Sequence, residues 1–235
     1  MFYTDFAEDY EKIFPFRENI YSFLKAYLPP QGKRILDIGC ATGHYCGRFA
    51  SEGYIPLGID LDSQMIKSAS TNYTSADFRI LDLTKIDSIE SEFDLIYSTG
   101  NVMAHISESD FLSFLKSIKR KMTKSGIWIF QVINWDFILT QQEFTFPVIE
   151  TDSKSFHRKY TEIGEKELIF HTELTNRETG KSVFKDKVTM YPLPSYKYID
   201  IHERAGFQLR GHFSDYSETP FFSSNFSADI YVFSL

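Results

Sequence analysis

The sequence predicts an α/β protein built on a doubly wound, mostly parallel sheet of seven strands. Up to residue 133, short apolar runs of strand type alternate with amphipathic segments of helix type, which is the pattern of successive βαβ units. After residue 140 the pattern changes to residue-by-residue alternation of apolar and polar side chains. That change predicts an inserted antiparallel β meander, followed by a hairpin with an antiparallel final strand.

The first part of the chain supplies five strands and the helices between them. The strand-like runs are residues 34–38, 55–60, 78–81, 93–97 and 127–133. The helix-like segments are residues 17–28, 44 to about 51, 63 to about 70, and 107–122. Pro29 and Pro30 end the first helix, and Asp62 or Ser63 can cap the third. Parallel strands joined in this way imply right-handed crossovers.

The last part of the chain supplies the meander and the closing hairpin. The alternating runs are residues 144–149, 155–163, 168–174 and 182–190. Turn-like residues separate them, and a helix pattern returns at residues 195–205. The two final strands, residues 206–213 and 228–233, are expected to pair with each other. We therefore expect one domain over residues 1–235, with residues 141–193 as an inserted, lid-like meander.

Composition and charge exclude several classes of protein. With 235 residues and 43% hydrophobic content, the chain is long enough for one large domain with a full core. No run approaches the roughly 18 apolar residues of a membrane span, and the start of the chain is acidic and aromatic rather than basic and then apolar. The net charge of −7 disfavours a general nucleic-acid binder. We expect a soluble cytoplasmic protein without membrane or nucleic-acid partners, whose oligomeric state stays open.

The two cysteines and the histidines do not indicate a metal or disulfide framework. Cys40 and Cys46 lie six residues apart across a turn and its helix, which disfavours a structural disulfide. Neither thiol has metal-ligand partners nearby in the sequence, and the histidines lack metal-like spacing. We expect reduced thiols and no metal.

A turn with two glycines follows the first strand, in the sequence Asp37-Ile38-Gly39-Cys40-Ala41-Thr42-Gly43. A dinucleotide site would need G-x-G-x-x-G, because three glycines let the backbone approach a pyrophosphate. The spacing G-x-x-x-G suits a ligand that presses on the turn and has no pyrophosphate, and S-adenosylmethionine is such a ligand. The alternative interpretation is that the glycines only permit positive φ and close helix packing.

Residues 35–43 resemble the first motif of class I S-adenosylmethionine-dependent methyltransferases, and the strand ends up to about residue 135 fit the same pattern. The resemblance implies a Rossmann-like sheet, S-adenosylmethionine as cofactor and S-adenosylhomocysteine as product. It implies that Asp60 binds the ribose hydroxyls and that Asp82 reads the adenine amine. Each of these acids is alternatively a helix cap. Asp60 also lies about 20 residues past the turn, where a ribose-binding acid is expected.

Two short segments narrow the resemblance to one branch of the family. Residues 100–105, and Phe6-Ala7-x-x-Tyr10 near the start, resemble glycine N-methyltransferase-like enzymes, which implies a small-molecule methyl acceptor. The nucleic-acid amino-methylases carry an Asn/Asp-Pro-Pro-aromatic motif after the fourth strand. Ser98-Thr99-Gly100-Asn101 stands at that position, which disfavours base methylation.

The expected site residues lie at strand ends and in the turns that follow them. The cofactor-binding candidates are Tyr10, Asp37, Gly39, Cys40, Ala41, Gly43, Asp60, Leu61, Met65, Asp82, Leu83, Ser98, Gly100 and Asn101. His105 either bonds locally, contacts the cofactor or accepts a proton, and in the last role it is the catalytic candidate. Tyr10 and Phe14 either cover the sulfonium, since aromatic faces attract cations, or pack in the core.

The predicted function is transfer of a methyl group to a nitrogen or oxygen of a small molecule. The cofactor carries the reactive carbon, so the protein has mainly to align the acceptor and exclude water. The meander is expected on the substrate side, where it would carry the selective residues. The alternatives are methylation of protein or RNA, a non-catalytic S-adenosylmethionine sensor, and an NAD-dependent oxidoreductase, which the incomplete glycine motif disfavours.

Overall fold

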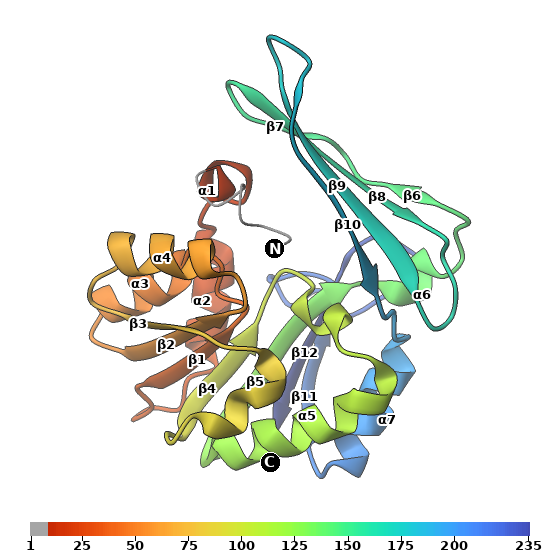
Figure 1. Ribbon diagram of the computed structural model, residues 1–235. Coiled ribbons are helices and arrows are strands. Elements are labelled where there is room, and N and C mark those ends of the chain that lie inside the picture. Colours follow the sequence, from red (N-terminus) through yellow and green to blue (C-terminus); the bar gives the residue numbers. More distant parts are fainter. Residues whose placement is uncertain (1–8) are drawn as a thin grey trace.

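The computed structural model describes residues 9–235. They form a large sheet with helices on both faces and a smaller second sheet (Figure 1). The two residues Phe6 and Ala7, which contributed to the resemblance, lie outside this range. The second sheet projects from one edge of the helix-covered unit (Figure 1). The predicted α/β class is confirmed.

The large sheet has seven strands in the order β11-β12-β5-β4-β1-β2-β3. The first five strands pair in parallel, and β12 runs antiparallel to both of its neighbours, as predicted for a final hairpin. Their bounds are β1 (Arg34–Ile38), β2 (Ile55–Asp60), β3 (Asp77–Ile80), β4 (Phe93–Ser98), β5 (Met122–Ile133), β11 (Gln208–Phe213) and β12 (Ala228–Ser234).

One strand begins earlier than its pattern predicts. β5 starts at Met122 rather than at residue 127, because Met122 pairs with Phe93 before the register shifts. The intervening residues 123–126 are mostly polar and form an irregular stretch of the strand. An apolar run therefore cannot reveal this part of β5.

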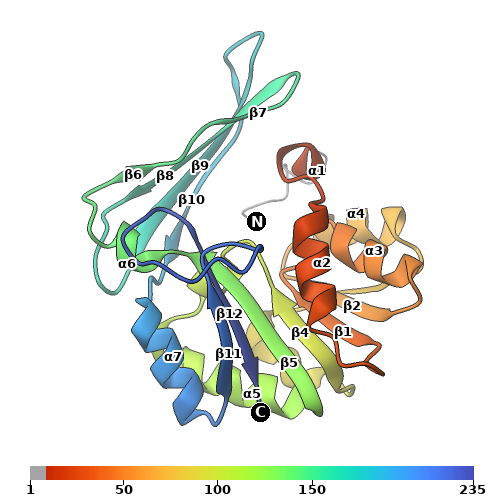
Figure 2. The ribbon, with the colours of Figure 1, turned by 180° about the vertical axis from the view of Figure 1, so that it is seen from behind.

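Helices cover both faces of the large sheet. One face packs against α2 (Glu18–Ala26) and α3 (His44–Ser51), and the other against α5 (Glu108–Lys121) and α7 (Ser195–Arg204). Figure 2 shows α2 in front of the sheet and α5 behind it. The remaining helices are α1 (Tyr10–Ile13), α4 (Ser63–Asn72), the 3₁₀ helices η2 (Leu83–Ser88) and η3 (Val102–His105), and α6 (Trp135–Ile138). Over residues 9–235, no helix combines the length and apolar character of a membrane span.

The second sheet is the predicted antiparallel meander. It has the order β10-β9-β8-β6, with β7 also paired to β8. Its strands are β6 (Phe144–Thr145), β7 (Ile149–Glu150), β8 (Lys154–Thr161), β9 (Leu168–Asn176) and β10 (Ser182–Met190). The single strand expected at residues 144–149 is wrong, because Pro147 separates β6 from β7 and proline has no N–H for a sheet hydrogen bond.

Candidate active site

The carboxyl ends of the parallel strands meet at one edge of the large sheet, and the second sheet rises beside this edge (Figure 1). The strand order changes direction between β1 and β4, which lie side by side although β2 and β3 intervene in the chain. In open α/β sheets, ligands bind in the crevice at such a switch point. The turn after β1 and the loop after β4 are thus the expected walls of a site.

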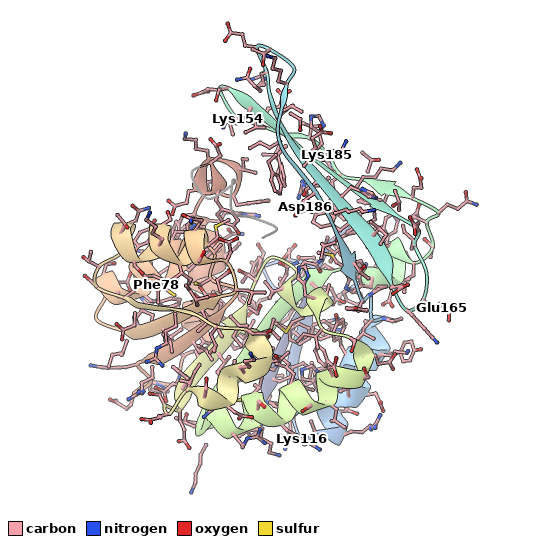
Figure 3. The ribbon with its side chains drawn as sticks, viewed as in Figure 1. Phe78, Lys116, Lys154, Glu165, Lys185 and Asp186 are labelled. Carbon is pink, nitrogen blue, oxygen red and sulfur yellow. The ribbon has the colours of Figure 1, made fainter. Side chains whose placement is uncertain are left out.

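The turn after β1 is held tightly by its surroundings. Gly39 and Gly43 have φ of 78° and 79°, in the left-handed region that favours glycine. A Cβ on Gly39 would lie 2.5 Å from a Val102 methyl, and one on Gly43 would lie 2.5 Å from the ring of Phe78. Phe78 reaches Gly43 from β3 and its ring lies under α3 and α4 (Figure 3). Close packing therefore requires both glycines, whatever ligand the turn also contacts.

Asp60, at the end of β2, joins the turn after β1 to the turn after β2. One carboxylate oxygen accepts from the backbone N–H of Ala41 at 2.9 Å, and the other accepts from the N–H of Asp62 at 2.9 Å. Burial raises the pKa of Asp60, and these backbone hydrogen bonds oppose the shift. The cap of α4 is Asp62, whose carboxylate accepts from the N–H groups of Gln64 and Met65. Asp60 is therefore not the cap of α4.

Asp37 is a buried acid at the end of β1. Only 3% of it is exposed, and its carboxylate accepts from the Tyr97 hydroxyl at 2.8 Å and from the Cys46 thiol at 3.6 Å. Burial raises the pKa of Asp37 to about 7, although the bonds from Tyr97 and Cys46 lower it; the charge of Asp60 adds a smaller increase. The charge of Asp37 therefore responds to a cation placed nearby. Both cysteines are buried free thiols, and burial raises their pKa well above its ordinary value.

The loop after β4 is fastened at several points. The hydroxyl of Ser98 donates to the carbonyl of Ile38 at 2.7 Å, which ties β4 to β1. The N–H of Gly100 donates to the side chain of Gln131 at 2.8 Å. Gly100 and Asn101 both have positive φ, 77° and 71° respectively. This backbone shape turns the loop back over the end of β4.

Asn101 links this loop to both sheets. Its Oδ1 accepts from the N–H of Ile133 in β5 at 3.0 Å, and its Nδ2 donates to the Tyr160 hydroxyl of β8 at 3.2 Å. The backbone N–H of Tyr191, just after β10, donates to the carbonyl of Ala104 at 2.8 Å. The second sheet is thus attached directly to the loop that forms one wall of the site.

Two candidate residues have mainly local surroundings. Asp82 caps η2, since its carboxylate accepts from the N–H and the hydroxyl of Thr84 at 2.8 and 2.7 Å, and Leu83 begins that helix half-buried. His105 ends η3 and is exposed, and no residue in the range 9–235 hydrogen-bonds to its ring. Partial desolvation lowers the pKa of His105, which favours the neutral ring at pH 7.

The second sheet also packs on the first turn through a buried cluster, which we call the roof cluster. Its members are Ile13, Ala41, Met65, Phe156, Leu174 and Phe184. Phe14 of the adjoining segment lies between Tyr10 and Phe156, with ring centroids 5.2 and 5.8 Å away. The meander, α1 and the turn after β1 therefore share one buried apolar cluster.

The structure thus brings together most of the predicted site residues, and adds partners that sequence reasoning missed. Asp37, Cys40, Ala41, Asp60 and Met65 surround the first two turns. Leu61 is 57% exposed beside them, and Ser98, Gly100 and Asn101 line the neighbouring loop. Their roles in binding stay predictions. The missed partners are Tyr97, Tyr160 and the roof residues of the meander, which local sequence patterns do not connect to the glycine turn.

Comparison with known proteins gives a consistent set of matches. Residues 35–126 match the family model described as a methyltransferase domain. The chain is 25% identical to the putative methyltransferase YqeM of Bacillus subtilis over 93% of its length and 92% of that protein. It is also 25% identical to a ubiquinone biosynthesis O-methyltransferase of Agrobacterium fabrum, over 57% of this chain and 64% of that one. A crystal structure of an S-adenosylmethionine-dependent methyltransferase from Clostridium acetobutylicum has the same fold, with a TM-score of 0.82, 16% identity, and coverage of 99% and 98%.

Proposed function

Because this chain is a class I S-adenosylmethionine-dependent methyltransferase, we propose that it transfers the methyl group to a nitrogen or oxygen of a small molecule. The observation that carries the proposal is the roof cluster, in which residues of the meander, Ile13 of α1, and Ala41 and Met65 form one buried apolar group. A lid that joins both the cluster at the glycine turn and the loop after β4 favours a small acceptor over a polymer. The net charge of −7 agrees with a non-nucleic-acid acceptor.

The residues at the strand ends fit the cofactor. The Thr42 hydroxyl, in the glycine turn, is buried and has no hydrogen-bond partner among residues 9–235, so a ligand atom can satisfy it. Leu61 offers an exposed apolar surface next to Asp60, which suits a base and its ribose. We propose that Asp37, Asp60 and Asp82 meet the polar groups of the cofactor and that the backbone of residues 39–43 lies against it.

The protein's share of the chemistry is placement and exclusion of water. When bound, the cofactor supplies an electrophilic methyl group on a sulfonium. The roof cluster and the loop at Asn101 hold the two sheets in a fixed relation, so an acceptor between them is presented in one orientation. An acceptor that must lose a proton needs a base, and we propose His105 because its lowered pKa keeps the ring neutral.

We further propose that residues 1–235 act as one domain, in which residues 141–193 form the lid over the acceptor. The attachment of Tyr160 to Asn101 and of Tyr191 to Ala104 supports this division, since both bonds join the meander to the catalytic sheet's own loop. The meander would then be a wall of the site rather than a separate module.

The test is incubation of the protein with methyl-labelled S-adenosylmethionine and an extract of cell metabolites, followed by separation of products by size. We expect release of S-adenosylhomocysteine and label in one or a few small molecules. Asp60→Ala should abolish both, and the exposed Asp200→Ala should change neither. Label recovered in protein or RNA contradicts the small-molecule acceptor. Cofactor binding by calorimetry without turnover would favour a sensor.

A further inference from the structure

The inner face of the meander, which faces the large sheet, carries one polar row between apolar rows. Side chains alternate between faces along a strand, and the register aligns every second residue across β8, β9 and β10. The first three rows are Phe156–Leu174–Phe184, Arg158–Thr172–Asp186 and Tyr160–Phe170–Val188. We call the middle one the polar row. Apolar residues at the three positions of the polar row would complete the core. The polarity of this row therefore calls for another explanation.

Contacts of the two flanking rows locate the polar row above the site. Phe156 lies in the roof cluster with Ile13 and Ala41, so the first row lies on the side of the turn after β1. Tyr160 receives the hydrogen bond of Asn101, so the third row lies over the loop after β4. The polar row between them therefore lies on the side of the ends of β1 and β4, which flank the switch point of the sheet.

The middle member of the polar row has an unsatisfied group. Thr172 is 1% exposed, and its hydroxyl makes no hydrogen bond to any residue that the structure describes. A buried hydroxyl without a partner costs roughly 1 to 3 kcal/mol, so such groups are normally bonded to protein, water or ligand. The Thr172 hydroxyl can therefore bond a polar atom of a ligand.

Asp186 contributes a half-buried carboxylate without a neighbouring cation. Within residues 9–235 no lysine, arginine or histidine nitrogen lies within 4.0 Å of it, and it accepts a local bond from the N–H of Lys187 at 2.7 Å. Lys185 projects from the opposite face of β10, where it pairs with Glu173 (Figure 3). A partly desolvated carboxylate favours a cationic partner, and a protonated amine is the small-molecule group that supplies one.

Arg158 ends the row on the other side. Its guanidinium lies 4.8 Å from the ring centroid of Phe146 and donates to the carbonyl of Pro147 at 3.3 Å. Aromatic contact on its face orients the planar group. Neighbouring strands are about 4.8 Å apart, so the backbones of Arg158 and Asp186 are separated by about 10 Å, roughly the span of one small ring with its substituents.

We propose that the polar row binds the methyl acceptor, and that the acceptor is an oxygen-rich small molecule with an amino group held by Asp186. Thr172 and Arg158 bind its hydroxyl or carboxylate oxygens. The inference rests on the proposed function and deepens it, because it names the chemical class of the acceptor and the residues that select it.

The experiment measures binding separately from turnover. Protein saturated with S-adenosylhomocysteine is titrated with matched pairs of sugars that differ only in an amino group, D-glucosamine against D-glucose and D-galactosamine against D-galactose, by saturation-transfer NMR. We expect at least one amino sugar to bind about tenfold or more tightly than its partner. Asp186→Asn should remove this preference, and Lys187→Gln on the outer face should keep it. Thr172→Val should weaken both members of a pair alike.

Two outcomes would overturn the proposal: wild-type protein that binds both members of each pair equally, or an Asp186→Asn variant that retains the preference. Circular dichroism and the dissociation constant of S-adenosylhomocysteine, unchanged in each variant, exclude a folding defect. Methyl transfer to an acceptor without an amine, together with equal binding in the pairs, would leave the proposed function standing and refute only this inference. A preference for the amino sugar without any turnover would support this inference and refute the proposed function.

Discussion

The hydroxyl of Tyr97 in β4 donates a 2.8 Å hydrogen bond to the carboxylate of Asp37 in β1, and both side chains are almost completely buried. This pair lies at the switch point, where the two strands are neighbours in the sheet. The bond holds the acid in place, while burial raises its pKa to about 7. An acid placed in this way costs stability in the free protein and gains from a bound cation.

Asp37→Asn should separate stability from cofactor binding. The folded-state pKa of Asp37, about 7, lies above the unfolded value of 3.8, so the native state holds the extra proton between these values. The free energy of unfolding of the wild type therefore falls as pH rises from about 4 to 7, by at most ~1.4 kcal/mol per pH unit for this group. The variant should lack this fall and bind S-adenosylmethionine more weakly. Urea unfolding between pH 5 and 8, with calorimetry at pH 7.5, checks both; identical pH slopes would refute it.

His202 should make the protein sensitive to acid. Its Nδ1 faces the Tyr198 carbonyl at 2.6 Å and its Nε2 accepts from the Trp128 indole at 3.1 Å, so the ring is neutral and fully buried. Burial lowers its pKa to about 3, so the unfolded chain binds a proton that the native state does not as pH falls below about 6.5. Stability from this group is complete above pH 6.5 and is lost toward pH 3.

The test of His202 compares two histidine variants. His202→Gln should cost roughly 2 to 4 kcal/mol at pH 7, because it removes a stacked ring and disturbs two buried bonds, and should flatten the decline between pH 6.5 and 4. His157→Gln, on the outer face of the meander, should leave the profile unchanged. Thermal unfolding at several pH values provides the measurement. A decline of the same steepness in His202→Gln would assign the acid sensitivity to other groups.

Asn101→Ala should loosen the second sheet from the loop after β4. The change leaves the N–H of Ile133 without its acceptor and the hydroxyl of Tyr160 without its donor, at a cost of about 1 to 3 kcal/mol. Tyr160→Phe, which removes the hydroxyl that accepts from Asn101 and leaves the bond to Ile133 in place, should cost less but raise KM for the acceptor similarly. Hydrogen exchange of β8 amides and steady-state kinetics report the two effects. Unchanged exchange in both variants would contradict this role of Asn101.

Gly43→Ala should be far more harmful than an alanine at another glycine with the same backbone shape. A Cβ at residue 43 would lie 2.5 Å from the Phe78 ring and 2.9 Å from the Ala69 Cβ, in addition to the strain of positive φ. Gly180, with φ of 67°, has open space around it, so Gly180→Ala bears the conformational strain alone, about 1 kcal/mol. We expect at least twice that loss at Gly43. Equal losses in chemical denaturation would show that packing is not the reason for Gly43.

Strands bounded by clear breakers could be predicted from the sequence, and contacts between distant segments could not. The ranges 34–38 and 55–60 agree with β1 and β2 to the residue, because each is a short apolar run that ends in a glycine turn or an acid. The early start of β5 depends on its pairing with β4, which periodicity does not contain. The break between β6 and β7 is due to Pro147, which interrupts an alternating run without changing its alternation.

The candidate site shows the same division. The glycine turn and Asp60 follow from local sequence, whereas the partner of Asp37 stands 60 residues away in Tyr97. The polar row needed the alternation of three strands and also their mutual register. Alternation is visible in the sequence, but register is decided by turn lengths and by packing of the buried face.

The roof cluster has a further consequence for how the chain assembles. Ile13 lies in one buried cluster with Phe156 and Phe184, and these two residues are synthesised more than half a chain length after Ile13. The helix α1 therefore cannot pack in its native position until the meander has formed. Bringing α1 and the meander together closes a long loop, which is among the slower steps of folding. During synthesis, the first strands of the large sheet can pair early. The roof cluster is completed only later, when the meander packs with α1.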